Sequence, residues 1–244
     1  MPNTATAADP GRALLRHFDA LWIINLPERT DRRRETVAEL ARVGLAPGRD
    51  GVAFFDGIRG DAAHGFATAG AYGCFRSHLA VLEQAQAQGH RAVLVAEDDL
   101  EFRLPFAHDL DSVLAPLAGD DWDFFYPAYH YHDRFLSEGS GLLDLGDRYD
   151  IGGLHLYAVH RRILPALIAS MHQRIADNRA GKPGPGYPDP HYSAFRAANP
   201  GIVTQILSPG IADQRASRSD IVPARLYDRV PGVRQAVALL RRLR

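Results

Sequence analysis

The sequence has a single cysteine, Cys74, and no uninterrupted apolar run of the roughly 20 residues that a membrane-spanning helix needs. A lone cysteine cannot form a disulfide within the chain, so the sequence fits a reducing compartment. The first 18 residues lack the apolar core and the small-residue cleavage site of a secretory signal. We therefore expect a cytoplasmic protein in which Cys74 is a small buried hydrophobe.

A surplus of charge of one sign is also lacking. The 244 residues include 28 Lys and Arg and 29 Asp and Glu, which gives a formal net charge of −1. This balance provides no general attraction to nucleic acid, so we expect no nucleic-acid partner. Neither GxxxxGK followed by Ser or Thr nor GxGxxG occurs after the first apolar run. Their absence argues against a P-loop enzyme and against a dinucleotide-dependent dehydrogenase.

Short apolar runs alternate with segments of helical periodicity through most of the chain, and this alternation predicts an α/β fold. The first apolar run, at 21–26, is a predicted strand, and the helix after it is predicted to turn Val37, Leu40 and Val43 inward. Further strands are expected at 51–58, 92–96, 121–126, 154–159 and 202–207. Further helices are expected before Gly89 and at 105–117, 161–176 and 191–197. Loops or a small hairpin are expected at 127–153.

The two ends of the chain differ in composition from its middle. We expect a flexible arm at 1–18, one folded domain at 19–224 and a basic amphipathic tail at 225–244. The tail is interpreted either as a helix that contacts anionic lipid at the inner face of the membrane or as a solvated helix that packs on the domain. The glycine- and proline-rich stretch at 178–190 is a candidate mobile lid over a site.

Glu97, Asp98 and Asp99 directly follow the apolar run at 92–96 and form the main candidate site. In open α/β sheets the ligand crevice lies at the carboxyl ends of the strands. Because side chains alternate along a strand, Glu97 and Asp99 are predicted to share a face and Asp98 to point away. Two carboxylates on one crevice suit Mg²⁺ or Mn²⁺, which typically bridges to substrate phosphates. The alternative is that the three acids only begin a solvated turn.

A basic loop with the sequence NLPERTDRRR follows the first predicted strand, at 25–34. Arginine binds phosphate through its fork of N–H donors, and the start of a helix adds backbone N–H groups. A basic loop and an acidic strand end at the same crevice would suit a nucleotide diphosphate that is bridged by a metal ion. The alternative is a surface helix whose arginines pair with Glu28, Asp31 and Glu35.

Four segments in this order resemble glycosyltransferase family 25: WIINLPERTDRRR at 22–34, GCFRSH at 73–78, VLVAEDDLEF at 93–102 and LYAV at 156–159. That family includes lipooligosaccharide galactosyl- and glucosyltransferases and collagen galactosyltransferases. The resemblance runs from about residue 21 to 221. It implies a GT-A-like fold, with a Rossmann-type mixed sheet flanked by helices in a single domain. It also implies a UDP-sugar donor, a divalent cation (Mn²⁺ or Mg²⁺) and inversion at the anomeric carbon.

The same resemblance suggests roles for individual residues. Asp99 and Glu97 are the expected metal ligands, and Asp189 is the preferred catalytic base, with His191 as its alternative. A helix N-cap is the competing interpretation of Asp189, and a packed helix histidine is the competing interpretation of His78. The residues expected to bind the nucleotide-sugar donor or the acceptor are Asn25, Pro27, Arg29, Arg32, Arg33, Ser77, His78, Glu97, Asp98, Gln214 and Ser217.

The sequence therefore predicts an inverting, metal-dependent hexosyltransferase that moves galactose or glucose from a UDP-sugar to a saccharide or glycolipid acceptor. The expected pathway is lipopolysaccharide or surface-glycan biosynthesis, at the cytoplasmic face of the membrane. A metal-dependent nucleotidyltransferase or a sugar-nucleotide hydrolase would use the same acids and is the alternative enzyme. A nucleotide-sugar binding protein without turnover is the alternative outside the enzymes.

Overall fold

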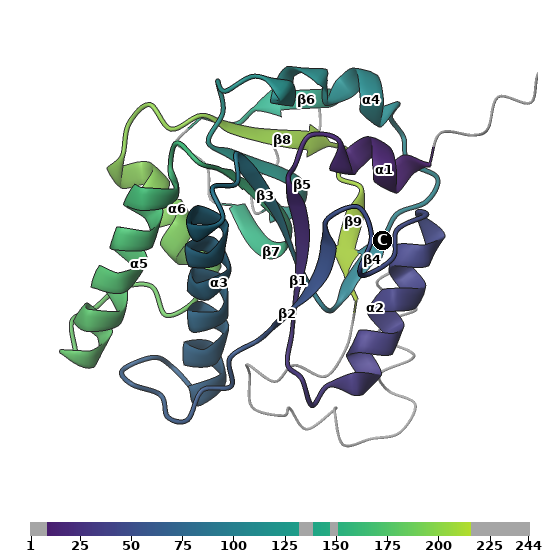
Figure 1. Cartoon of the computed structure of the whole chain (residues 1–244). Helices are drawn as coiled ribbons and strands as arrows, with labels where there is room; N and C mark the ends of the chain where they lie inside the picture. The colour runs from purple at the N-terminus through teal and green to yellow at the C-terminus, as the bar shows by residue number, and fades with distance from the viewer. Residues whose placement is uncertain (1–8, 132–138, 147–150, 216–244) are drawn as a thin grey trace, which may run out of the picture.

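The computed structural model describes residues 9–131, 139–146 and 151–215. Its core is a seven-stranded sheet with the order β2-β1-β3-β7-β5-β8-β6, and β4 and β9 form a separate two-stranded ladder (Figure 1). The strands are β1 (Ala20–Asn25), β2 (Val52–Asp56), β3 (Ala92–Glu97), β4 (Leu100–Phe102), β5 (Phe124–Tyr131), β6 (Gly141–Asp144), β7 (Ile151–His160), β8 (Thr204–Ser208) and β9 (Ala212–Gln214).

The sheet is mixed, and the strand direction changes at β7. β1 pairs in parallel with β2 and β3, whereas β7 is antiparallel to both of its neighbours, β3 and β5. The carboxyl ends of β1 and β3 therefore lie at the same edge of the sheet. Residues 97–99, which we call the acidic turn, begin at this edge. The predicted α/β class, with a mixed sheet flanked by helices, is confirmed.

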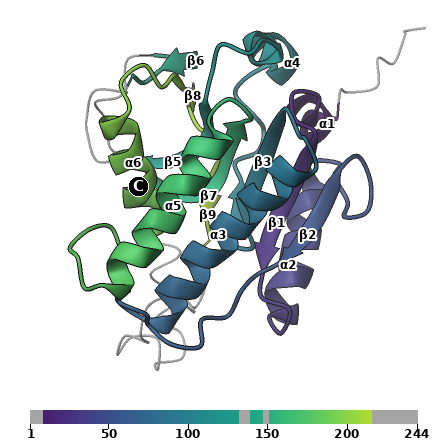
Figure 2. The same ribbon diagram turned by 60° about the vertical axis from the view of Figure 1, so that its left-hand side comes forward.

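Helices cover both faces of the sheet (Figure 2). Alternate strand residues divide between two hydrophobic clusters, so that Trp22 and Val95 pack beneath α3, α5 and α6, and Leu21 and Leu94 pack beneath α1, α2 and α4. A strand that is buried on both faces appears as a continuous apolar run in the sequence. The helices are α1 (Pro10–Leu15), α2 (Thr30–Arg42), α3 (Ala69–Ala87), α4 (Leu110–Val113), α5 (Leu164–Arg179) and α6 (Pro188–Ala198).

Helix α2 turns a partly polar face toward the sheet. Leu40 and Val43 are buried as predicted, but Val37 is 42% exposed, so its predicted place on the inner face is wrong. Arg32 and Thr36 are buried instead, two turns and one turn before Leu40. The three buried residues Arg32, Thr36 and Leu40 lie on one face of the helix, as its 3.6-residue period requires. Arg32 and Thr36 face the acidic turn and donate hydrogen bonds to Asp98.

Several predicted boundaries are wrong. β5 continues to Tyr131 and β7 begins at Ile151, inside the stretch at 127–153 that was expected to form loops or a small hairpin. The flexible arm predicted at 1–18 is too long, because residues 10–15 form α1 and Leu14 is fully buried in the second hydrophobic cluster; residues 1–8 lie outside the described residues. The single helix predicted at 105–117 is replaced by α4 and a 3₁₀ turn at Ala115–Ala118. Pro116 lacks the N–H group that a continuous α-helix would require there.

The stretch predicted as a mobile lid, 178–190, joins α5 to α6. The Arg174 side chain of α5 donates hydrogen bonds to the carbonyl oxygens of Lys182 at 2.9 Å and Pro183 at 3.0 Å, which ties the stretch to that helix. The basic tail expected at 225–244 lies outside the described residues. Among the helices that the structure describes, none has both the length and the apolar character to cross a bilayer.

Candidate active site

Asp98 fastens the acidic turn to the elements around it. Its Oδ1 accepts a hydrogen bond from Arg32 Nη1 of α2 at 2.6 Å, and its Oδ2 accepts one from Asn25 Nδ2, at the end of β1, at 2.8 Å. Thr36 Oγ1 donates to the Asp98 carbonyl oxygen at 2.8 Å. All four residues are buried. Asp98 is thus a carboxylate with its own charged partner, and its role in this arrangement is to hold the turn in place.

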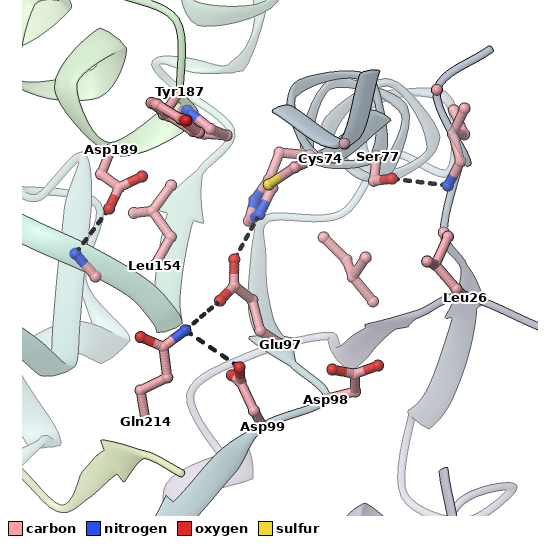
Figure 3. A pocket seen from close by; sticks show the side chains of 18 of the residues that line it. Leu26, Cys74, Ser77, Glu97, Asp98, Asp99, Leu154, Tyr187, Asp189 and Gln214 are labelled. Carbon is pink, nitrogen blue, oxygen red and sulfur yellow. Dashed lines mark hydrogen bonds and ion pairs between the residues drawn. The ribbon is translucent and has the colours of Figure 1, made fainter. Parts of the chain in front are cut away.

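Glu97 and Asp99 share a partner, Gln214. Gln214 Nε2 donates to Glu97 Oε2 at 3.4 Å and to Asp99 Oδ2 at 3.2 Å, while Asp98 is turned aside (Figure 3). The β4–β9 ladder places Gln214 opposite Leu100, which explains how so distant a part of the chain reaches the acidic turn. Asp99 Oδ1 is buried and has no hydrogen-bond partner among the described residues.

Burial and neighbouring carboxylates raise the pKa values of Glu97 and Asp99. Burial, reinforced by the charges of Asp189 and Asp98, raises the pKa of Glu97 to about 8. Burial, reinforced by the charge of Glu97, raises the pKa of Asp99 to about 7. A divalent cation between the two side chains would offset the same repulsion and restore both to the carboxylate form.

Helix α3 presents Ser77 and His78 to the acidic turn. His78 Nε2 lies 3.2 Å from Glu97 Oε1, and Nδ1 lies 2.8 Å from the Tyr157 hydroxyl of β7. Burial lowers the pKa of His78 to about 4, so the imidazole is neutral near pH 7. Ser77 Oγ accepts from the backbone N–H of Ile58 and donates to the Gly73 carbonyl oxygen, each at 2.8 Å. Ser77 therefore ties the segment at 57–60 to the helix.

The segment at 57–60 packs directly on the first turns of α3. A Cβ atom added to Gly73 would lie 2.5 Å from Gly60 N and 2.5 Å from Ile58 O, and one added to Gly60 would lie 1.9 Å from Ala69 O. Only glycine permits backbones to approach this closely. This approach places Gly57, Ile58, Arg59 and Gly60 at the wall of the pocket described below.

Asp189 enters the site from α6. It occupies the second position of that helix, after Pro188, and the N-cap is Tyr187, so the N-cap interpretation of Asp189 is wrong. Its Oδ2 accepts a hydrogen bond from the backbone N–H of Gly153, on β7, at 3.0 Å. Gly153 has φ +81°, a left-handed conformation that favours glycine.

A pocket with a volume of about 750 Å³ connects these groups (Figure 3). Its volume lies in the range of ~300–1,000 Å³ that is typical of small-molecule sites. The two metal-ligand candidates and the preferred base therefore border one cavity. The predicted site residues that line it are Arg32, Ser77, His78, Glu97, Asp98, Asp99, Asp189 and Gln214.

Three residues of the basic loop do not line the pocket. Pro27 lies on the surface. Arg29 makes two hydrogen bonds to Asp31, at 3.0 and 2.9 Å, and the guanidinium of Arg33 lies 4.2 Å from the centre of the Phe54 ring. Arg29 thus pairs with Asp31, as the surface-helix alternative expects of the loop, whereas Arg33 stacks on an aromatic ring and pairs with none of the three expected acids. Among the arginines of this loop, Arg32 lines the pocket.

The other predicted residues have different places. His191 is buried on α6, with Nε2 3.0 Å from Ser170 Oγ, and burial lowers its pKa to about 4. Because His191 does not line the pocket, the prediction of this residue as an alternative base is wrong. Asn25 acts through Asp98 and does not border the cavity. Ser217 lies outside the described residues.

Several lining residues were not predicted from the sequence. Arg59 pairs with Glu28, and Arg215 donates to the Asp98 carbonyl oxygen at 3.0 Å. Cys74, expected to be only a buried hydrophobe, is half-buried in the wall of the pocket. Its position four residues before His78 on a helix was a usable signal, because such residues lie on one helical face. Tyr187 is a further lining residue with an aromatic ring that was not assigned to the site.

The fold and the pocket define an α/β protein whose ligand site lies at the carboxyl ends of its strands. Its sequence is similar to proteins of glycosyltransferase family 25, which confirms the expected resemblance. An alignment 128 residues long, which covers 45% of the chain, is 29% identical to inactive glycosyltransferase 25 family member 3 of Homo sapiens. An alignment 127 residues long, which also covers 45% of the chain, is 32% identical to procollagen galactosyltransferase 1 of Danio rerio. An alignment 135 residues long, which covers 48% of the chain, is 27% identical to probable inactive glycosyltransferase 25 family member 3 of Bos taurus.

The matched segments span only 21% to 23% of the lengths of these relatives. No protein-family model matches the chain. Among solved structures, a glycosyltransferase involved in the glycosylation of the major capsid of PBCV-1 aligns over 64% of this chain and 67% of its own, and mannose-1-phosphate geranyltransferase from Thermus thermophilus aligns over 80% and 74%. Both have a TM-score of 0.36 and 14% sequence identity.

Proposed function

We propose that this protein is an inverting glycosyltransferase that moves galactose or glucose from a UDP-sugar to a saccharide acceptor with the help of a divalent cation. The similarity to glycosyltransferase family 25 proteins supports the reaction class. One structural observation carries the proposal: Glu97 and Asp99 share Gln214 in a pocket that Asp189 also lines. In this proposal Glu97 and Asp99 hold the cation that offsets the charge of the diphosphate leaving group, and Asp189 is the base for the acceptor hydroxyl.

Glu97 and Asp99 fit a hard divalent cation. Both supply carboxylate oxygens, the ligand type that Mg²⁺ and Mn²⁺ prefer, and the buried Asp99 Oδ1 has no protein partner among the described residues. When bound, the cation would neutralise charge on the diphosphate as UDP leaves. Gln214 orients the two carboxylates, and Asp98 holds the turn through Arg32.

The donor side of the pocket combines guanidinium groups with apolar surface. Arg32, Arg59 and Arg215 line it together with the acidic turn, and planar guanidinium groups are suited to phosphate oxygens. Leu26 and Ile58 line the same pocket and provide apolar surface for the nucleobase. In this proposal the diphosphate lies between the arginines and the acidic turn.

Asp189 is the proposed catalytic base. The acceptor hydroxyl gives its proton to Asp189, and the oxygen of that hydroxyl forms a bond to the anomeric carbon of the donor sugar. The bond from the anomeric carbon to the phosphate oxygen of UDP breaks at the same time. Attack opposite to UDP inverts the anomeric configuration. The Gly153 N–H fixes Asp189 Oδ2 at 3.0 Å, so Oδ1 is the oxygen proposed to receive the proton.

Release of UDP tests the proposal. Protein incubated with UDP-galactose or UDP-glucose and Mn²⁺ is expected to release UDP only when a saccharide acceptor is added. Asp189→Asn is expected to lower kcat by about 10²–10⁴-fold with UDP affinity retained, because it removes the base alone. Asp99→Asn is expected to abolish Mn²⁺-dependent UDP binding. Glu83→Gln is the matched control, since Glu83 is an exposed carboxylate that pairs with His172 outside the pocket.

Two other outcomes would change the assignment. Release of pyrophosphate or sugar phosphate would contradict transfer and favour the nucleotidyltransferase or hydrolase. Mn²⁺-dependent UDP binding without acceptor-dependent UDP release would favour a nucleotide-sugar binding protein without turnover. Two of the relatives are named inactive, which supports keeping this alternative.

The proposed acceptor is a glycolipid of the lipopolysaccharide class, at the cytoplasmic face of the membrane. The sequence resemblance and the basic composition at 225–244 support this part of the proposal. Sedimentation of the full chain with anionic vesicles, but not of a chain ending at residue 224, is the expected result. Equal sedimentation of both chains would contradict a role for the tail.

A further inference from the structure

Cys74, His78 and Glu97 form a second group of metal-ligand side chains in the wall of the pocket. One ligand atom from each, the sulfur, a ring nitrogen and a carboxylate oxygen, lies within 4.8 Å of the other two. Cys74 and His78 are four residues apart on α3 and so share one helical face. Glu97 approaches from the end of β3, and Figure 3 shows its carboxylate directed toward the helix that carries Cys74. The proposed function gives the thiol no role.

The chemistry of this group differs from that of the Glu97–Asp99 pair. Thiolate and imidazole favour Zn²⁺ over Mn²⁺ or Mg²⁺. Zinc bonds of about 2.0–2.3 Å place tetrahedral ligands about 3–4 Å apart, so ligand atoms within 4.8 Å need only small side-chain movements to close on one ion. A thiolate and a carboxylate would also balance the charge of Zn²⁺.

His78 has an outer partner of the kind that supports metal ligation. Its Nδ1 lies 2.8 Å from the Tyr157 hydroxyl, which lies 3.3 Å from the Tyr192 hydroxyl. In the tautomer with the proton on Nδ1, the ring donates to Tyr157, Tyr157 donates to Tyr192, and the Nε2 lone pair faces Glu97. Outer hydrogen bonds of this type fix the tautomer and the ring orientation at zinc sites.

We propose that Cys74, His78 and Glu97 bind one Zn²⁺ ion, with the fourth position open to the pocket. When zinc binds, bonds from the Cys74 sulfur and the Glu97 oxygen to zinc form, and the thiol proton and the proton of the protonated Glu97 fraction pass to solvent. Since Glu97 would then be engaged by zinc, the ion would weaken binding of the hard cation at the acidic turn and inhibit transfer. This consequence rests on the proposed function, whereas the zinc site itself does not.

Co²⁺ is the probe, because its absorption reports the ligand type. The reduced full-length protein, freed of metal and titrated with Co²⁺, is expected to gain a sulfur-to-cobalt charge-transfer band that saturates at one equivalent and that Zn²⁺ removes. Cys74→Ser is expected to abolish this band and to weaken Zn²⁺ binding, measured against a chromophoric chelator, by more than about tenfold. Asp99→Asn is the matched control, since it alters the same turn but none of the three ligands, and it should keep the band.

Tyr157→Phe tests the orientation of His78. It is expected to keep the charge-transfer band at saturating Co²⁺ but to weaken Zn²⁺ binding by about tenfold, because only the outer partner is lost. Thermal melting without metal checks that each variant folds, and Cys74→Ala replaces Cys74→Ser if the latter does not.

Absence of the band in the wild-type protein, or an equal band in the cysteine variant, would overturn the zinc site. Neither measurement uses a nucleotide sugar, so failure of the proposed transferase activity would leave this result intact. Equal inhibition of the wild type and Cys74→Ser by Zn²⁺ would overturn the inhibitory consequence alone.

Discussion

Neighbouring carboxylates in the acidic turn have different surroundings. Asp98 is enclosed by Arg32 and Asn25, with its two hydrogen bonds at 2.6 and 2.8 Å, whereas Asp99 Oδ1 is buried without a partner among the described residues. A buried carboxylate with its own cation stabilises structure, whereas the unpaired Oδ1 of Asp99 is available to a ligand even though its Oδ2 accepts from Gln214. At the scale of residues, Asp98 therefore holds the acidic turn in place, while Asp99 is the acid with an oxygen open to a ligand.

The buried pair of Arg32 and Asp98 gives a stability prediction. Their side chains are 10% and 8% exposed, and Arg32→Met would leave the Asp98 charge buried without its cation. The free energy of unfolding, measured by chemical denaturation, is expected to fall by about 3–5 kcal/mol. Arg33→Met, at the next position, removes only an exposed cation–π contact with Phe54 and is expected to cost less than about 1 kcal/mol. Equal losses in the two variants would contradict the assigned role of Arg32.

At the scale of elements, the close fit of the segment at 57–60 against α3 depends on Gly73. Alanine within a helix is normally more stable than glycine by about 1 kcal/mol. Here an added Cβ would lie 2.5 Å from backbone atoms of Ile58 and Gly60, so the segment must move away from the helix. Gly73→Ala is expected to lower the free energy of unfolding by about 1–3 kcal/mol and to weaken UDP binding, measured by denaturation and by thermal shift.

Gly119→Ala is the matched control for Gly73→Ala. Gly119 has φ −77°, and a Cβ there would meet only Pro116 O, at an ordinary 3.6 Å. Its effect on stability is expected to remain within about 0.5 kcal/mol. If Gly73→Ala raised the free energy of unfolding, the segment at 57–60 would be able to move away from α3 without loss of stability, and the prediction would be wrong.

The connection between α5 and α6 depends on Arg174, whose two hydrogen bonds hold the carbonyl groups of residues 182 and 183. Arg174→Met is expected to accelerate amide hydrogen exchange at 181–187, because the segment loses its link to α5. Arg179→Met, which removes a hydrogen bond to the Tyr72 hydroxyl at 2.9 Å, is the control and should leave that segment unchanged. If exchange in this segment is already fast in the wild type, the mobile lid expected from its composition is the better description.

At the scale of the whole molecule, the sequence predicts the class of fold better than the assembly of the site. Each central strand is buried on both faces, so it appears as an apolar run that can be recognised locally. The antiparallel insertion of β7 between β3 and β5 depends on pairing between distant segments and leaves no local pattern. The approach of Gln214 to the acidic turn depends on the β4–β9 ladder for the same reason.

Asp189 and His191 illustrate this limit within a single helix. The two residues flank Pro190, so sequence position favours both as the base. On a helix, however, residues two positions apart do not share a face. Asp189 therefore lines the pocket while His191 packs against Ser170, a distinction that requires knowledge of where the helix begins.

Folding and cation binding are expected to be linked through the protonation of the acidic turn. Without a cation, the pKa of Glu97 is raised to about 8 and that of Asp99 to about 7, well above the values of the unfolded chain. Such groups contribute stability that is present at pH values below the unfolded pKa and is lost as the pH rises through about 7–8. Below that window, Mn²⁺ must displace protons in order to bind.

Mn²⁺ is therefore expected to raise the thermal midpoint more at pH 8 than at pH 6. For each proton that Mn²⁺ must displace, its apparent affinity falls about tenfold per pH unit below the pKa of the ligand. Mn²⁺ binding should therefore weaken at least about tenfold between pH 8 and pH 6. A cation at a hundred times its Kd stabilises by about 2.7 kcal/mol, which makes the effect measurable as a shift in Tm. Glu97→Gln removes one titrating ligand and should make the Mn²⁺-induced shift in Tm depend less on pH, whereas Glu83→Gln should leave that pH dependence unchanged. A Mn²⁺-induced shift of the same size at both pH values in the wild type would show that the cation does not bind these carboxylates.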